Sequence, residues 1–157
     1  MELKTYQRQV IADLNRYLEM LGETQDYSAS FRLFWQEKGA PMLGIYQDVL
    51  PGVPNLCFKV PTGGGKTFLA VRPVFDALPF TKTKAVVWLV PSDAILTQTV
   101  KALKDPRHPY RQKIDVDFGG RVEVYTKQEL LNGQNFNPTS VTEQLSIMVL
   151  SYDSFRG

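Results

Sequence analysis

The sequence has 157 residues and a formal net charge of +2, with 43% hydrophobic and 22% charged residues. This length suits one ordinary globular domain, and the composition excludes a disordered chain. The charge is too nearly balanced to indicate a nucleic-acid partner by itself. The longest apolar run, residues 85–90, is far short of a membrane span, and the first residues lack the apolar segment of a secretory signal. Because Cys57 is the single cysteine, no internal disulfide is possible, and we expect a cytoplasmic protein with no membrane contact.

The first residues are predicted to be helical. Apolar side chains recur every three or four residues over residues 3–21, and Gly22 is placed to end that helix. A second helix is expected over residues 27–38, with Gly39 after its last turn. The prolines and glycines of residues 40–54 are typical of a connecting loop. The apolar faces of these helices need another layer to cover them, so we expect a helical preface and not an independent domain.

Apolar runs then alternate with helical patterns. Residues 56–60 form a short apolar run that predicts a strand, followed by a glycine-rich turn and a helix over residues 66–78 that Pro73 kinks or interrupts. The later runs are continuously apolar, as in parallel strands buried on both faces, and this rhythm predicts an α/β fold. The expected strands are residues 85–90, 122–126 and 147–150, and the expected helices are residues 92–103 and 127–131.

The most informative segment lies between the first predicted strand and its helix. Residues 60–67 read Val-Pro-Thr-Gly-Gly-Gly-Lys-Thr, and Val60 stands where the usual phosphate-loop pattern has its first glycine. A glycine-rich turn at a helix start directs amide N–H groups and the positive end of the helix dipole at one point, which favours an anion. We expect Lys66 to reach the β and γ phosphates of a nucleotide and Thr67 to bind Mg²⁺. The residues predicted to contact the phosphates are Thr62, Gly63, Gly64, Gly65, Lys66 and Thr67, and the catalytic pair is Lys66 and Thr67.

Over almost its whole length the sequence resembles the superfamily-two helicases of the DEAD/DEAH group. The form of residues 61–67 is similar to motif I of that group, and Tyr6 with Gln7 resembles its upstream glutamine motif. Residues 90–92, Val-Pro-Ser, resemble motif Ia, and residues 151–155, Ser-Tyr-Asp-Ser-Phe, stand where the next loop contacts the nucleic-acid backbone. The long preface and this form of motif I are similar to the amino-terminal part of the restriction (Res) subunit of type III restriction enzymes.

The resemblance implies a RecA-like fold with a mostly parallel sheet. Residues 1–54 would be the helical preface that carries the glutamine motif, and residues 55–157 the amino-terminal part of the ATP-binding domain. Gln7 would read the adenine edge. The residues implied to contact the nucleic-acid backbone are Pro91, Ser92, Ser151 and Tyr152.

The resemblance also implies cofactors and partners. ATP with Mg²⁺ would be bound, and the complete protein would hydrolyse it as a DNA-dependent helicase or translocase. Duplex DNA and a modification (methyltransferase) subunit would be its partners. From the residues alone two alternatives stay open, a nucleotide-binding module without hydrolysis and a different phosphate-loop enzyme such as a nucleotide kinase.

A motor of this group also needs the Asp-Glu pair of motif II, which holds Mg²⁺ and positions the attacking water. The sequence contains no Asp followed by Glu, and Asp153, after the last predicted strand, is a poor substitute because no Glu follows it. Asp115 and Asp117 alternate with apolar residues, which indicates an edge strand with one wet face. We therefore expect these 157 residues alone not to turn over ATP.

Other conspicuous residues are expected to be structural. The basic segment of residues 101–113 is predicted to be mainly a solvated loop after a helix, because a basic cluster has meaning only with a defined geometry. Cys57, Trp35 and Trp88 are predicted to lie in the core.

Overall fold

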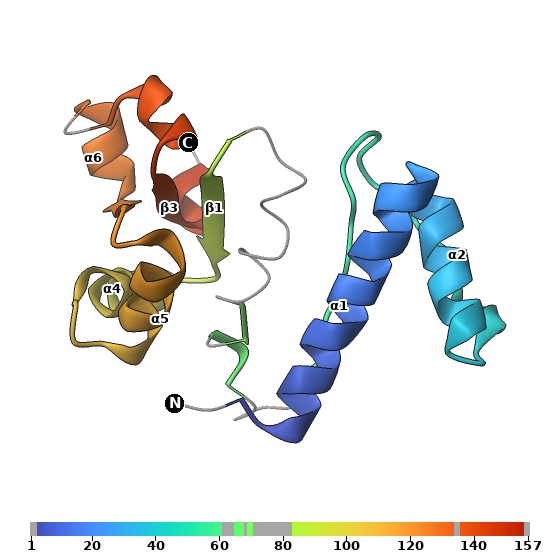
Figure 1. Cartoon of the computed structure of the whole chain (residues 1–157). Coiled ribbons are helices and arrows are strands. Elements are labelled where there is room, and N and C mark those ends of the chain that lie inside the picture. Colours follow the sequence, from blue (N-terminus) through green and yellow to red (C-terminus); the bar gives the residue numbers. More distant parts are fainter. Residues whose placement is uncertain (1–2, 61–64, 68, 71–82, 134–135, 156–157) are drawn as a thin grey trace. The chain divides into compact units, whose positions relative to one another are not determined.

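The computed structural model divides the chain into two compact units, unit 1 at Met1–Pro73 and unit 2 at Val74–Gly157 (Figure 1). The sequence-based domain boundary after residue 54 stays a prediction. Among the helices that the structure describes, none combines the length and the apolar character needed to cross a membrane. The residues that the structure describes are 3–60, 65–67, 69–70, 83–133 and 136–155.

Unit 1 contains the two helices predicted at the start of the chain. Helix α1 spans Thr5–Thr24 and helix α2 spans Tyr27–Glu37. The prediction that α1 ends at Gly22 is wrong, because the helix continues and its C-cap is Gln25, which has φ 54°. Glycine inside a helix costs only about 1 kcal/mol. The last turn includes Leu21, which packs partly buried against the core of the unit.

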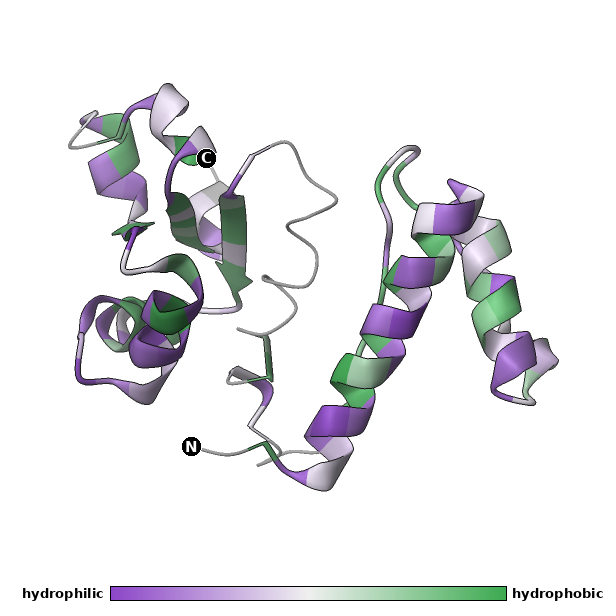
Figure 2. Cartoon of the chain, in the orientation of Figure 1, coloured by the Kyte–Doolittle hydropathy of each residue, from purple (hydrophilic) through white to green (hydrophobic). Residues whose placement is uncertain are grey.

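Apolar faces of α1 and α2 pack against each other. Figure 2 shows hydrophobic and hydrophilic stretches side by side on both helices, as expected of amphipathic helices. Burying one large aliphatic or aromatic side chain contributes roughly 1.5–3 kcal/mol, so this cluster supplies much of the stability of the unit. The prediction that Trp35 belongs to the core is confirmed, since it packs against the cluster. The buried residues are Leu14, Tyr17, Leu18, Met20 and Phe34, and those partly buried against them are Leu21, Phe31, Trp35 and Leu56.

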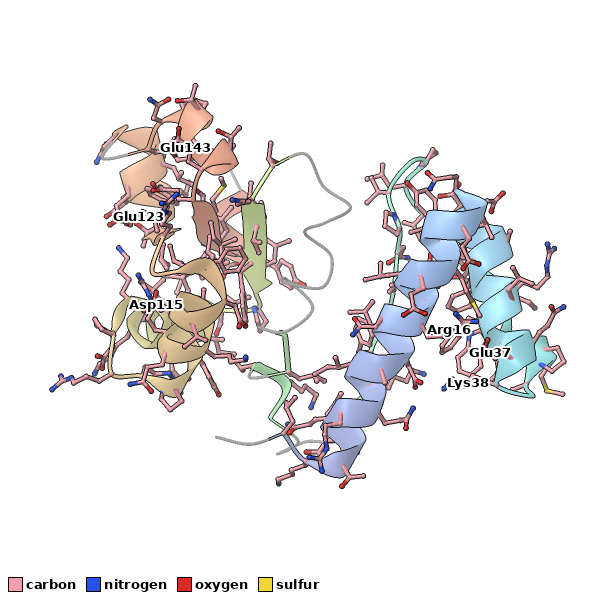
Figure 3. The ribbon with its side chains drawn as sticks, viewed as in Figure 1. Arg16, Glu37, Lys38, Asp115, Glu123 and Glu143 are labelled. Carbon is pink, nitrogen blue, oxygen red and sulfur yellow. The ribbon has the colours of Figure 1, made fainter. Side chains whose placement is uncertain are left out.

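An ion pair joins the exposed sides of the same helices. Arg16 of α1 faces Glu37 at the end of α2, and its guanidinium donates from Nη2 at 2.7 Å and from Nε at 3.0 Å (Figure 3). The hydrogen bond with Glu37 raises the pKa of Arg16, and the same bond lowers the pKa of Glu37. Both side chains are solvated, so the pair orients the helices more than it stabilises them.

Residues 56–60 do not form the strand that the sequence predicts. The segment has no regular secondary structure, and Cys57, predicted to lie in the core, is exposed. A strand needs a neighbour for its backbone hydrogen bonds, and no strand occurs among the described residues of unit 1. Leu56 packs against the helical core instead.

Unit 2 is built on a three-stranded parallel sheet in the order β1-β3-β2, with β1 at Ala85–Val90, β2 at Val122–Tyr125 and β3 at Leu145–Ser151. The central strand is the most buried, with Ile147 at 1% and Val149 at 0% exposure. Helix α4, at Asp93–Lys104, packs on all three strands, and the predicted α/β class is confirmed. The unit also has α5 at Pro109–Phe118, α6 at Lys127–Leu131, η3 at Pro138–Thr142 and η4 at Tyr152–Phe155, and unit 1 has η1 at Pro41–Leu43.

Two predictions are wrong for the segment that forms helix α5. The sequence predicts a solvated loop and then an edge strand with Asp115 and Asp117, and the structure has a helix there. The Arg111 Nε donates to Asp115 Oδ1 at 2.8 Å, and the Lys113 ammonium lies 3.2 Å from the Asp117 carboxylate. These opposite charges are four residues apart, which makes them neighbours on a helix. The helix also ends on Gly119, whose φ of 59° is the left-handed conformation that terminates helices.

The outer strand β1 and the central strand β3 differ in burial. The prediction that the strands are buried on both faces holds for β3 and fails for β1, where Val87 is 56% and Leu89 46% exposed. Successive side chains of a strand point to opposite faces of the sheet, and in β1 the side chains of one face are the exposed ones. Trp88, predicted to lie in the core, is partly buried on the packed side.

Candidate functional site

The predicted phosphate loop ends at the start of a helix. Gly65 has φ +70°, and its carbonyl accepts the Leu69 amide at 2.9 Å, so it is the residue before the first helical turn. Lys66 and Thr67 are the first helical residues, and both are exposed. The amides of a first turn have no carbonyl partner within their own helix, which suits an anion. Thr62, Gly63 and Gly64, predicted to contact phosphates, lie outside the described residues.

The glutamine of the predicted adenine motif lies against this turn. Gln7 belongs to α1, is only 4% exposed, and accepts the Lys4 amide on Oε1 at 2.8 Å. A β-carbon built on Gly65 would stand 2.8 Å from Gln7 Nε2. The positive φ favours glycine at position 65, and any other residue there would have to displace the neighbouring Gln7 amide. The fold brings Gln7 and Gly65 together across a long stretch of sequence.

The predicted backbone-contacting loops lie in unit 2, at the carboxyl ends of adjacent strands. Val90 of β1 is in register with Ser151 of β3, so both strands end at the same edge of the sheet. Ser92 caps α4, and its Oγ accepts the Ile95 amide at 3.4 Å. In open parallel sheets this edge is where ligands bind.

The side chains at this edge differ in accessibility. Pro91 is exposed and Ser92 is half-buried, while Tyr152 is 55% exposed. Ser151 is only 1% exposed. The fold thus brings the four predicted residues to one edge, but it presents Pro91 and Tyr152 more openly than Ser151.

A hydrogen-bond network beneath that edge was not expected from the sequence. Ser151 Oγ donates to Asp93 Oδ1 at 2.7 Å and lies 3.2 Å from Ser154 Oγ. The Ser151 amide donates to Ser154 Oγ at 3.3 Å, and Lys127 Nζ donates to the Ser154 carbonyl at 2.8 Å. The network joins α4, β3, η4 and the start of α6. The only sequence signal for it is that Asp93 follows a capping serine and Lys127 follows a strand end.

The family described as type III restriction enzyme, res subunit, matches the chain over residues 1–157. The chain belongs to this family. No curated protein and no solved structure matches it. The resemblance to type III restriction subunits inferred from the sequence is thereby confirmed, and membership places the chain in the general class of helicase-type hydrolases.

In this res-subunit family member, one carboxylate near the network has a strongly shifted pKa. Glu129 of α6 forms a capping box with Thr126, whose amide donates to Glu129 Oε2 at 2.7 Å. Lys104 of α4 donates to Glu129 Oε1 at 2.6 Å. The hydrogen bond from Lys104, aided by those from Thr126, lowers the pKa of Glu129 to about 2. This ion pair links α4 to α6.

The three aspartates considered for motif II lie in environments unlike that of a metal-binding pair. Asp115 and Asp117 are paired with basic residues on α5, and Asp153 is an exposed residue of η4. Within the part of the chain that the structure describes, no group of three or more His, Cys, Asp or Glu side chains is arranged to hold a metal ion. The roles assigned to individual site residues from the sequence stay predictions.

Proposed function

We propose that this chain binds Mg-ATP at the turn that ends in Gly65, within a DNA-dependent helicase or translocase motor of a type III restriction enzyme. The observation that carries the proposal is the position of Gln7 beside Gly65 at a helix start. A buried amide from α1 and a glycine turn are two separate sequence motifs of ATP-binding motors, and they meet in one place. Membership in the res-subunit family supports the same function.

The described residues at this turn have the chemistry needed to bind the triphosphate of a nucleotide. The left-handed Gly65 leaves no β-carbon above the turn, and the first-turn amides supply donors for phosphate oxygens. The Lys66 ammonium would neutralise charge on the β and γ phosphates, and the Thr67 hydroxyl would bind Mg²⁺. When bound, Mg²⁺ would withdraw negative charge from the phosphate oxygens. Gln7 would read the adenine edge, because an amide donates and accepts at once.

The second half of the proposal is contact with duplex DNA at the edge formed by the ends of β1 and β3. Ser92 and Tyr152 supply hydroxyl groups, and Pro91 adds an exposed apolar surface. Hydroxyl and amide donors to phosphates position a protein on DNA without reading its sequence. A translocase requires contacts of this kind, because it moves along any sequence. A modification subunit would be the protein partner.

Isothermal calorimetry with Mg-ATP tests the nucleotide site. Lys66→Ala is expected to weaken binding by roughly 1.5–3 kcal/mol, the usual contribution of a hydrogen bond to a charged group. Lys101→Ala, which removes an exposed lysine of α4 in unit 2, is the matched control and is expected to bind as the wild type does. Equal affinity in the wild type and in Lys66→Ala would remove the proposal.

A further inference from the structure

The carboxyl edge of the sheet in unit 2 depends on a side chain that sequence reasoning had assigned to nucleic-acid contact. Ser151 ends β3, and its hydroxyl is within hydrogen-bond distance of both Asp93 and Ser154. The residue is 1% exposed, so a phosphate oxygen has no open path to that hydroxyl. Tyr152, the next residue, is exposed, so of these two side chains only that of Tyr152 is open to a phosphate.

The partner of Ser151 lies at the first residue of α4, directly after the capping residue Ser92. At 2.7 Å, the bond from Ser151 Oγ to Asp93 Oδ1 is a charge-assisted one, a stronger class than a bond between two neutral groups. Asp93 is exposed and negatively charged, which makes it unsuited to touch DNA phosphates itself. It is suited to hold the start of α4 against the end of β3.

A second set of hydrogen bonds holds the η4 turn, which follows Ser151. Ser154 Oγ accepts the Ser151 amide at 3.3 Å, and the Ser154 carbonyl accepts Lys127 Nζ at 2.8 Å. The η4 turn, which begins with Tyr152, is thus tied to β3 and to the first residue of α6. With the bond from Ser151 to Asp93, hydrogen bonds thus connect four elements that end or begin at the carboxyl edge, namely β3, α4, η4 and α6.

We propose that Asp93 and Ser151 are positioning residues for nucleic-acid binding, which hold the Ser92 turn and the Tyr152 turn at a set separation. In this assignment Ser92 and Tyr152 contact the DNA backbone, and Ser151 acts through them. The inference rests on the proposed function, since it presupposes that this edge binds DNA. It assigns to the Asp93 carboxylate a role in binding a polyanion that its charge alone would oppose.

The test compares substitutions at residue 93 that carry the same charge but differ in whether they can accept a hydrogen bond. Asp93→Asn and Asp93→Ala remove the same charge, but only asparagine keeps an oxygen that accepts from Ser151. Ser151→Ala removes the donor, and the pair Asp93→Ala with Ser151→Ala completes the cycle. Binding of the full chain to a labelled duplex oligonucleotide is followed by fluorescence anisotropy at about 50 mM salt, where phosphate contacts are strong. Thermal melting of each variant is measured alongside, so that binding is compared well below every midpoint.

The hydrogen bond predicts a specific pattern. Asp93→Ala is expected to bind about fivefold more weakly than Asp93→Asn, the ratio that corresponds to one net hydrogen bond. Ser151→Ala is expected to bind more weakly than the wild type, and the double variant no more weakly than Ser151→Ala. Asp93→Asn is expected to bind at least as tightly as the wild type, because it keeps the bond and removes a negative charge.

Other outcomes overturn the proposal in distinguishable ways. If Ser151→Ala loses the same affinity whether residue 93 is Asp or Ala, Ser151 contacts DNA directly and is not a positioning residue. If melting temperatures fall but affinities stay equal, the network is only structural. If the wild type itself does not bind the duplex, the DNA half of the proposed function fails together with the inference.

Discussion

Gln7 of α1 and Gly65 before the first turn of the phosphate-loop helix are so close that a β-carbon on Gly65 would stand 2.8 Å from Gln7 Nε2. Real β-carbons essentially never approach a heavy atom this closely, so any other residue at position 65 must displace the amide. A hydrogen bond also restrains the Gln7 amide, because its Oε1 accepts the Lys4 backbone amide. A nucleotide at this turn would therefore meet a glutamine whose position depends on the glycine beside it.

The first prediction concerns Gly65→Ala. The positive φ alone costs an alanine about 1–2 kcal/mol, and the contact with Gln7 adds to that cost. Gly39→Ala is the matched control, since Gly39 lies in the same unit with φ +71° and would place its β-carbon in open space. We expect chemical unfolding to show a larger loss for Gly65→Ala than for Gly39→Ala, and calorimetry to show weaker Mg-ATP binding only for Gly65→Ala. Equal losses for the two variants would show that the Gln7 contact has no energetic weight.

Second, Gln7→Ala is expected to reduce the preference for ATP over GTP while Mg-dependent phosphate binding persists. The amide can pair with the adjacent donor and acceptor on the adenine edge, and alanine can do neither. A competition assay between the two nucleotides measures the ratio directly. Gln9→Ala, an exposed glutamine of the same helix, should leave the ratio as it is in the wild type. An unchanged ratio in Gln7→Ala would restrict Gln7 to packing against Gly65.

The third prediction is a pH dependence of the stability of unit 2. The hydrogen bond from Lys104 lowers the pKa of Glu129 from 4.5 to about 2, so the folded state favours the carboxylate. A depressed folded-state pKa contributes stability that is fully present above about pH 4.5 and is lost as the pH falls toward 2. The Glu129 side chain is 31% exposed, so we discount the full shift to about 1–2 kcal/mol.

Glu129→Gln should therefore lower the free energy of unfolding at neutral pH and flatten its decline between about pH 4.5 and 2. Urea unfolding across that range, followed by circular dichroism, measures both effects. Glu143→Gln changes an exposed glutamate of the same unit (Figure 3) and should keep the slope of the wild type. The same slope in Glu129→Gln and in the wild type would mean that the Lys104 pair contributes nothing.

Fourth, the 157-residue chain is expected to show no steady-state ATP hydrolysis at the rate of a motor, with or without DNA. In the proposed function the site residues would bind the ground state, and binding without additional transition-state contacts does not raise turnover. An arginine finger alone contributes about 10³–10⁵ in rate, and a motif II carboxylate pair is absent from the sequence. Phosphate release is the measurement, with Lys66→Ala as the control for contaminating ATPases. DNA-stimulated release that Lys66→Ala abolishes would show that Asp153 or another carboxylate completes the site.

Local patterns determined a large part of this structure. The periodicity of residues 3–21 and 27–38 predicts α1 and α2, and the continuous apolar runs predict the parallel strands of unit 2. The Thr126 capping box starts α6 where its spacing places it. These features could be predicted because they depend on neighbours within one or two turns, or on burial that every strand of a covered sheet shares.

Two segments differ from their predicted structure. The sequence of residues 114–118 alternates like a strand, but ion pairs four residues apart and a glycine cap stabilise a helix over residues 109–118. Residues 56–60 have the composition of a strand, yet the described part of their unit offers no strand to pair with.

The site shows the same division between local and distant information. The glycines, Lys66 and Thr67 were recognisable as a phosphate turn because that chemistry lies in consecutive residues. The neighbourhood of Gln7 and Gly65, and the bond from Ser151 to Asp93, join residues that no local pattern connects. Only the packing of α1 beside the turn and of α4 on β3 brings these side chains within hydrogen-bond or contact distance, because a side chain a few ångströms long reaches only what the fold places next to it.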